Sequence, residues 1–345
     1  MIEQHRVNQA LADLHHAYFL GLQLMVTREC GNEVVGDWTF RIFRQQHEQF
    51  FLASFEKLGL AGLPHAVACA RYHVLSNSIG GVPVEYAEES NTKAWVRFRY
   101  PRWMFAGPTL CGVPRESSLG FLRGWYAHNG VSLNNPRLGF VCVSEDMTGE
   151  FGFCGYFQEY DHTLSDEQRL RFARDERPPP FDPSQQPTLP SAQWDEARLA
   201  KANRNYAVTY IRNAVPRLVE VIGSDAACDI AARAARLIGL QYFSQIASQV
   251  GAADGDCNDA AAFLKAMFAG MGDEVTDSGA QGGDDVALTH SRLNVTNGVE
   301  EVHHAALVSA WCELWVGALR AQQQLKDITY ELHPDRVEWR IRPAR

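Results

Sequence analysis

Several patterns that identify common chemistries are missing from this chain of 345 residues. Its eight cysteines include no CxxC pair, its histidines form no HExxH or HxxxH motif, and its glycines form no GxGxxG, P-loop or GxSxG pattern. The neighbours His15-His16 and His303-His304 cannot share a metal ion, because adjacent residues of a helix point about 100° apart. We therefore expect no bound metal ion and no cofactor.

A basic charge and a long apolar run are missing as well. The net charge of −9 gives no field that would attract a phosphate backbone, so we expect no nucleic acid partner. Charged residues interrupt each apolar run before the ~18 residues that a membrane helix needs. The first residues form no charged-then-apolar signal pattern. We expect a cytoplasmic protein without membrane contact, whose cysteines stay reduced.

The chain does contain an ordinary globular composition and a repeated pattern. With 46% apolar, 21% charged and 11% aromatic residues, its length suffices for two domains of about 150 residues each. Residues 118–157 predict a helix, a loop and two strands, and residues 304–342 predict the same series, with a tight turn at His333. Trp125 corresponds to Trp311 at a shift of 186 residues. This pattern indicates an internal duplication.

Earlier blocks repeat in the same order. Gly59 and Gly251 close the predicted second helix of each copy, at a shift of 192 residues. The predicted strand at 95–101 corresponds to 286–292 at a shift of 191. Chance similarity between helical patterns is the alternative, and the preserved order of the blocks favours duplication.

Local signals place some helix ends. Gly31 is expected to end a first helix over residues 3–29, and Asp37 to cap a second helix over residues 38–58. The acidic stretch 273–285 contains glycine, serine and glutamine and is typical of a hairpin tip.

A proline-rich segment separates the copies. We predict a first repeat over residues 1–162, a linker over 163–195 and a second repeat over 196–345. A strap over the surface is the alternative for the proline-rich segment. Prolines exclude a helix or a central strand from the linker. Each repeat should be an α+β unit, with helices packed on one face of a four-stranded antiparallel sheet. We expect the two similar units to be related by a pseudo-twofold axis.

The order of helices, hairpin, helix and closing hairpin, with the aromatic strands FGFCGYF and VEWRIR, resembles the vinyl-reductase-like superfamily. Within it, the chain is most similar to the L-2-amino-thiazoline-4-carboxylic acid hydrolase-like family, as a tandem duplication. The similarity covers nearly all of the chain outside the linker. It implies the fold, together with a ligand-binding or hydrolytic role.

The predicted first hairpin carries candidate substrate-binding residues. Arg97 and Arg99 share one face of a strand, and Trp103 follows. Guanidinium groups suit the capture of a carboxylate. The alternative is a solvated sheet face on which the arginines pair with glutamates such as Glu85 across the hairpin.

The corresponding strand of the second copy offers a different set. A shift of 191 aligns Arg97 with Leu288 and Arg99 with His290, and Arg292 follows. Histidine titrates near neutral pH and suits acid–base catalysis, while Arg292 would bind substrate.

Cys111 lies in a loop shortly before a predicted helix, a setting that makes it a candidate nucleophile. The alternative is a buried structural cysteine. From these residues we expect an enzyme that acts on a small anionic, carboxylate-bearing metabolite, cyclic or aromatic, by hydrolysis or acid–base chemistry in a pocket between the repeats. A non-catalytic small-molecule sensor and an assembly subunit are the alternatives, and a homodimer is compatible with each.

Overall fold

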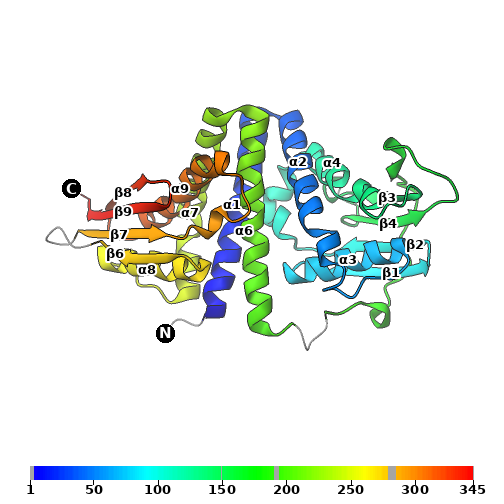
Figure 1. Cartoon of the computed structure of the whole chain (residues 1–345), viewed down its shortest axis with the longest axis horizontal. Helices are drawn as coiled ribbons and strands as arrows, with labels where there is room; N and C mark the ends of the chain where they lie inside the picture. Colours follow the sequence, from blue (N-terminus) through cyan, green and yellow to red (C-terminus); the bar gives the residue numbers. More distant parts are fainter. Residues whose placement is uncertain (1–3, 149, 190–193, 279–284, 345) are drawn as a thin grey trace. The chain divides into compact units, whose positions relative to one another are not determined.

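A computed structural model describes residues 4–148, 150–189, 194–278 and 285–344 of the chain (Figure 1). The chain divides into two compact units, which we treat separately. The first unit comprises residues 26–195, and the second comprises the residues up to 25 and those from 196 on. Within the described ranges, no helix is both long and apolar enough to cross a membrane.

The first unit combines helices with a five-stranded sheet. The sheet order is β1-β2-β4-β3-β5, with antiparallel pairing except between β3 and β5, which are parallel. Helix α3 packs on β1, β2 and β4. The elements are α2 (Asn32–Phe50), α3 (His65–Ile79), β1 (Val84–Ser90), β2 (Lys93–Phe98), α4 (Arg115–Gly124), α5 (Asn129–Ser132), β3 (Leu138–Ser144), β4 (Cys154–Glu159) and β5 (Leu170–Phe172).

The second unit has a four-stranded antiparallel sheet of order β6-β7-β9-β8. Helix α8 packs on β6, β7 and β9, in the way that α3 packs in the first unit. The elements are the first part of α1 (Gln4–Cys30), α6 (Glu196–Ile222), α7 (Ser224–Val250), α8 (Cys257–Met271), β6 (Glu274–Asp277), β7 (Val286–Ser291), α9 (His304–Arg320), β8 (Lys326–Leu332) and β9 (Arg336–Pro343). The predicted α+β class is confirmed.

The units divide at other residues than the predicted repeats. Residues 4–25 of α1 belong to the second unit, because their side chains contact its helices. The Tyr18 hydroxyl donates to the carbonyl of Ala231 (3.1 Å), and Trp311 Nε1 donates to His15 Nε2 (3.0 Å). The second compact unit is therefore built from two separate segments of the chain, whereas each predicted repeat is one continuous segment.

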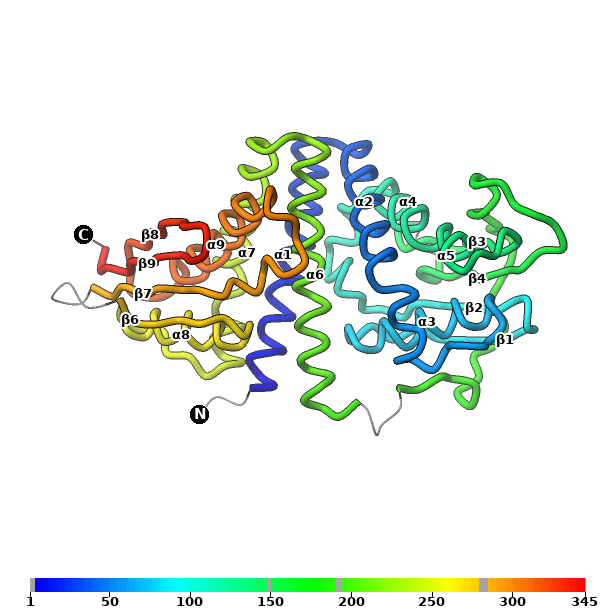
Figure 2. The backbone as a smooth tube through the Cα atoms, viewed as in Figure 1, coloured from blue at the N-terminus to red at the C-terminus, as the bar shows by residue number. Residues whose placement is uncertain are grey.

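Residues 163–189 belong to the first compact unit and pair with its sheet. Strand β5 adds to the edge of the sheet beside β3, which gives it a fifth strand. Further along, the Gln186 side chain accepts from the Tyr86 amide (2.9 Å) and donates to the Tyr86 carbonyl (2.8 Å). Figure 2 traces this green segment from β4 past β3 toward β1. The sequence left a linker and a surface strap open as alternatives, because these contacts join residues far apart in the sequence.

Three local predictions need correction. Helix α2 begins at Asn32, directly after Gly31, so Asp37 lies inside the helix and pairs with Arg41 at 3.0 Å. The helix predicted from residue 118 onward ends at Gly124 and continues as short helical turns. The acidic stretch forms strand β6, while residues 279–284 of the predicted tip lie outside the described part of the chain.

Candidate functional site

Arg97 and Arg99 both pair with one carboxylate. Glu85 on β1 pairs with Arg97 Nη1 through Oε2 (3.0 Å) and with Arg99 Nη1 through Oε1 (2.5 Å). Arg97 lies on β2, and Arg99 follows directly after the strand. This is the alternative arrangement that the sequence allowed, in which the arginines pair across the hairpin. It leaves Glu85 as a competitor for any ligand carboxylate at these guanidiniums.

Trp103 and Cys111 lie in the irregular segment after β2. Trp103 begins a 3-10 turn (Trp103–Phe105) and is half-buried. Cys111 ends a second 3-10 turn and is exposed, so it is not the buried structural cysteine of the alternative hypothesis. Helix α4 begins only at Arg115. The role of Cys111 as a nucleophile stays a prediction.

His290 is fully buried on β7, and Arg292 is an exposed residue just after it. His290 Nε2 lies 2.8 Å from Asp273 Oδ2, and its ring stacks on Phe268 at a centroid distance of 4.0 Å. Arg292 pairs with Glu274 at 2.6 Å. His290 is 0% exposed, a position from which it meets a bound substrate only after the surrounding helices move.

The predicted residues do not form a site within either unit. Arg97, Arg99, Trp103 and Cys111 belong to the first unit, and His290 and Arg292 to the second. The predicted pocket between the repeats concerns the placement of the two units and stays a prediction.

The shift of 191 residues between the two copies aligns side chains that lie on opposite faces of their sheets. Phe98 and His290 both point toward helices, with Phe98 near His73 of α3 and His290 on Phe268 of α8. Arg97 lies on the other face of its strand, since alternate residues point to opposite sides. A one-residue slip turns every side chain over, so a shift of 192 is the one that keeps the faces together.

The sheet faces away from the helices differ between the units. In the first unit, this face carries the Glu85–Arg97 pair beside a buried apolar cluster, against which Ala173 of the segment after β4 packs; the cluster comprises Trp95, Val141, Val143, Cys154 and Tyr156. In the second unit, the corresponding face of β9 carries charged residues, namely Arg336, Glu338, Arg340 and Arg342. An open, charged sheet face suits a ligand, whereas an apolar cluster covered by its own chain does not.

A hollow of about 170 Å³ lies on this charged face of the second unit. Ala287 is paired with Arg340 across β7 and β9, and its small side chain leaves room above the strands. At about 30 Å³ for each water of bulk liquid, the hollow has room for about six waters. Its lining comprises Ser278, Asp285, Val286, Ala287, Leu288, Glu338, Trp339, Arg340 and Arg342.

The charges around the hollow leave one guanidinium without a counter-ion in the described part of the chain. Arg342 Nε pairs with Asp285 at 3.1 Å, and Arg336 Nε pairs with Glu338 at 3.1 Å. Arg340 makes no ion pair or hydrogen bond with another described residue. An exposed guanidinium in a hollow on a rigid strand is a ready group for a carboxylate.

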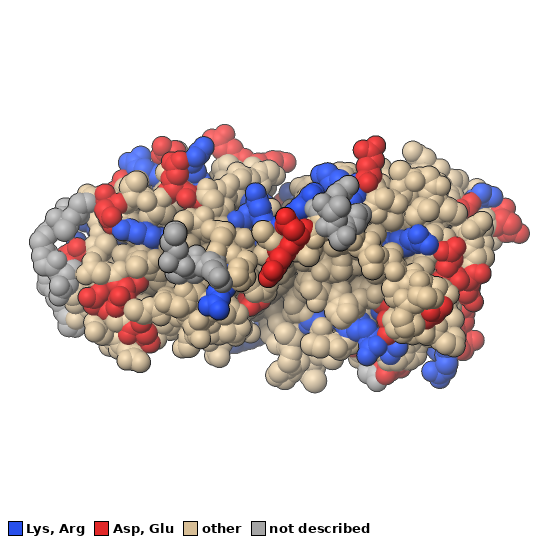
Figure 3. All heavy atoms as spheres, turned by 90° about the horizontal axis from the view of Figure 1, so that it is seen from below, with Lys and Arg blue, Asp and Glu red and all other residues tan. Residues whose placement is uncertain are grey.

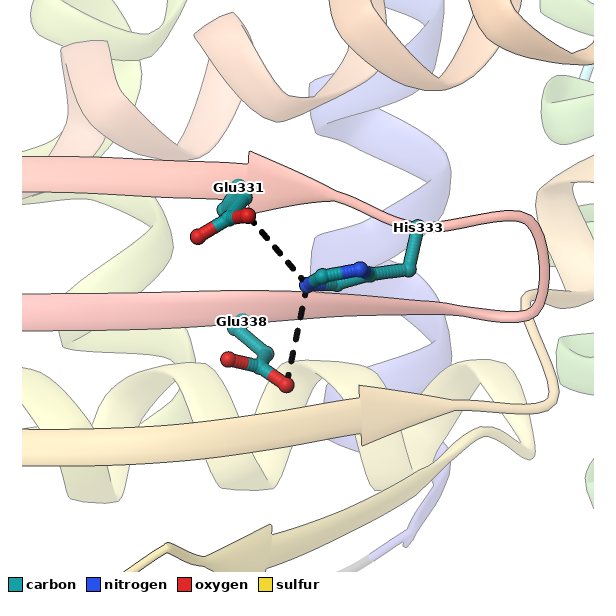
Figure 4. Close-up of side chains that lie close together, drawn as sticks. All are labelled: Glu331, His333 and Glu338. Atoms are coloured by element: carbon teal, nitrogen blue, oxygen red, sulfur yellow. Dashed lines mark ion pairs between the residues drawn. The ribbon is translucent and has the colours of Figure 1, made fainter.

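Three possible metal ligands lie together on the β8–β9 hairpin, and one of them, Glu338, also lines the hollow (Figure 4). Glu331, His333 and Glu338 each offer an atom within 4.8 Å of the others. Figure 4 shows the His333 ring lying between the two carboxylates at the end of the β8–β9 hairpin. Glu338 belongs to both the hollow and this group.

Hollows of the first unit are less suited to a small anion. One lies between α2 and α4, where Arg123 is outnumbered by three acidic residues; the lining comprises Glu33, Gly36, Asp37, Phe40, Glu116, Leu119, Gly120 and Arg123. Another carries Glu88 and Glu89 beside Arg71, whose guanidinium already pairs with Glu88 at 3.4 Å. Basic and acidic side chains are also interspersed over the molecular face in Figure 3.

Buried histidines in both units are structural rather than reactive. Burial lowers the pKa of His15 to about 4 and that of His47 to about 3, so both rings are neutral at pH 7. His15 Nδ1 lies 2.7 Å from the Leu11 carbonyl, and His47 Nε2 lies 3.0 Å from Asn129 Oδ1. Each ring thus completes hydrogen bonds inside a core.

In comparisons with models of protein families, with curated proteins and with solved structures, nothing matches this chain.

The sequence analysis did not predict the charged sheet face of the second unit. Its signal is the alternation in strand 336–342, where arginines and a glutamate alternate with Val337, Trp339 and Ile341. That alternation predicts a strand with one buried and one charged face.

Proposed function

We propose that the chain binds a small carboxylate-bearing molecule on the open face of the second unit's sheet. The observation that carries the proposal is Arg340, an exposed guanidinium that lines the hollow and has no partner among the described residues. Arg340 would hold the carboxylate. Ser278 and the paired Arg342 would border the rest of the ligand. The hollow's volume favours a compact ligand, in keeping with the small metabolite expected from the sequence.

Thermal unfolding with a panel of small carboxylates, each tested beside its own amide, examines this proposal. A ligand present at 100 times its Kd stabilises the folded protein by about 2.7 kcal/mol. We expect some carboxylates to raise the Tm and their amides to have no effect. Arg340→Gln should remove the increase. Arg320→Gln, an exposed arginine at the end of α9, should retain it.

Two results would contradict the proposal. One is a carboxylate response of equal size in wild type and in Arg340→Gln, which would place the ligand elsewhere. The other is a panel without any response. Ala287→Val gives a second variant, because it fills the hollow and leaves every charge in place. It should weaken binding of the same ligands.

Catalysis on the same ligand is a second candidate. Glu331, His333 and Glu338 favour it, because carboxylates and imidazole are the usual acid–base groups and Glu338 lines the hollow. Mass spectrometry of the bound carboxylate before and after incubation separates the two. An unchanged ligand supports a binding protein, and the addition of one water supports hydrolysis.

We also infer that the units derive from one duplicated fold. The two sheets share one strand order. In each, the first hairpin lies at one edge and its inner strand pairs with the last strand of the second hairpin, which gives β1-β2-β4-β3 in the first unit and β6-β7-β9-β8 in the second. Helices α3 and α8 begin and end at residues 192 apart. Gly31 and Gly223 precede α2 and α7 with φ values of 85° and 83°. A pseudo-twofold relation between the units stays a prediction.

A further inference from the structure

We propose that Glu331, His333 and Glu338 bind a divalent first-row transition metal ion of the Zn²⁺ class. The proposal depends on the geometry of one hairpin and is independent of carboxylate binding at Arg340. The metal experiment below therefore contains no carboxylate ligand, and either proposal can fail alone.

The hairpin brings the three side chains to one face. Glu331 and Glu338 are direct partners across β8 and β9. His333 follows Glu331 by two residues, and its amide donates to the Arg336 carbonyl (2.9 Å), which closes the turn. Because alternate residues of a strand share a face, the imidazole folds back over the two carboxylates, as Figure 4 shows.

The spacing is close to that of metal ligands. His333 Nε2 lies 3.8 Å from Glu331 Oε1 and 3.6 Å from Glu338 Oε1. Ligand atoms at 2.0–2.2 Å from a tetrahedral Zn²⁺ are roughly 3.3–3.6 Å apart. The three ligand atoms lie within 4.8 Å of one another, so rotations of these partly exposed side chains that close the gaps by up to about one ångström would complete the coordination.

The negative charges of the two carboxylates are also incompletely balanced by neighbouring cations. Carboxylates directly opposite each other on a sheet repel, and Arg336 pairs with Glu338 and with Asp335 rather than with Glu331. The Nε2 atom of His333 is shielded from solvent and makes no hydrogen bond with a described residue. A cation between the three ligand atoms would relieve the repulsion and satisfy this nitrogen.

The donor set selects the class of metal. One imidazole nitrogen and two carboxylate oxygens suit Zn²⁺ and its neighbours, whereas Ca²⁺ and Mg²⁺ prefer oxygen ligands alone. Three protein ligands leave one position open. Glu338 is two residues from Arg340 on the same face, so this position would adjoin the hollow.

Isothermal titration with Zn²⁺ tests the site. A Cys111→Ser background removes the exposed thiol, which would bind Zn²⁺ itself. We expect one equivalent of Zn²⁺ to bind, with affinity reduced at least tenfold in His333→Ala and lost in the double variant Glu331→Gln/Glu338→Gln. The control is His162→Ala, which removes an exposed histidine that lies 2.7 Å from Asp161 and should change nothing.

Unchanged Zn²⁺ binding in the double variant would overturn the proposal, and so would the absence of Zn²⁺ binding to the parent protein. Circular dichroism of each variant checks that the unit is folded. Co²⁺ in place of Zn²⁺ gives a second readout, since its visible spectrum reports nitrogen and oxygen ligands without sulfur.

Discussion

His290 Nε2 lies 2.8 Å from Asp273 Oδ2, and neither side chain reaches solvent. Asp273 Oδ1 also accepts from the backbone amide (2.8 Å) and the side-chain amide (2.9 Å) of Asn294. One buried carboxylate thus ties the end of α8 to β7 and to the turn that follows it. The contact is structural, and it explains why a histidine occupies an interior position of the sheet.

Replacing Asp273 with alanine should destabilise the second unit by about 3–5 kcal/mol, because it leaves several buried donors without an acceptor. Urea unfolding at pH 7 measures the effect. The matched control is Asp277→Ala at the exposed end of β6, which removes only the ion pair with Lys265. Exposed pairs contribute about 0.2–1 kcal/mol. Similar losses in the two variants would contradict the structural role of Asp273.

The stability of the second unit should fall below pH 6.5. Burial lowers the pKa of His15 from 6.5 to about 4, so the folded state favours the neutral ring. The stabilisation from this shift is complete above pH 6.5 and is lost as the pH falls toward 4, because the unfolded state takes up the proton first. The loss from this residue at pH 5 is roughly 2 kcal/mol.

Urea unfolding at pH 7.5 and pH 5.0 checks this expectation for wild type and for His15→Gln. The variant is less stable at both values, since it loses the bond to Leu11, but it should show a smaller difference between them. His162→Gln, at an exposed position, serves as the control. An equal pH dependence in wild type and His15→Gln would refute the assignment.

Gly120 should be intolerant of a side chain. A Cβ at this position would lie 2.4 Å from the Gly36 carbonyl oxygen on α2, and the backbone cannot yield as a side chain can. Gly120→Ala should cost at least about 2 kcal/mol through forced separation of α2 and α4. Gly36→Ala is the matched control, since its Cβ would meet the Glu116 Cβ at 3.2 Å and the change should stay within about 1 kcal/mol. Thermal unfolding compares the two.

Local signals were enough to predict much of the fold. The periodic apolar residues and the glycines predicted α3, α7 and the order of the elements. Gly251 ends α7 with a left-handed φ of 64°, as expected for a helix C-terminus. Asp37 failed as a cap because Gly31 already began the helix. Gly31 and Asp37 are two possible helix starts six residues apart, and residue propensity alone does not decide between them.

The candidate site could not be predicted in the same way. Arg97 and Arg99 form a plausible carboxylate site until the register of β1 and β2 places Glu85 between them. Glu331 and Glu338 become neighbours only through the pairing of β8 and β9. The sequence argument considered histidines at helical spacing, so a ligand set built by a turn and a cross-strand pair was overlooked.

The Gln186 side chain should protect the edge of the first sheet. Its amide donates to and accepts from the backbone of Tyr86, in the place that a neighbouring strand would take beside β1. Gln186→Ala should therefore speed hydrogen exchange at the Tyr86 amide by about tenfold, which corresponds to the loss of about 1.4 kcal/mol of local stability. Exchange at Val96, on the inner strand β2 between β1 and β4, should not change. Equal acceleration at both amides would indicate global destabilisation, and no acceleration at Tyr86 would show that the segment does not hold this edge.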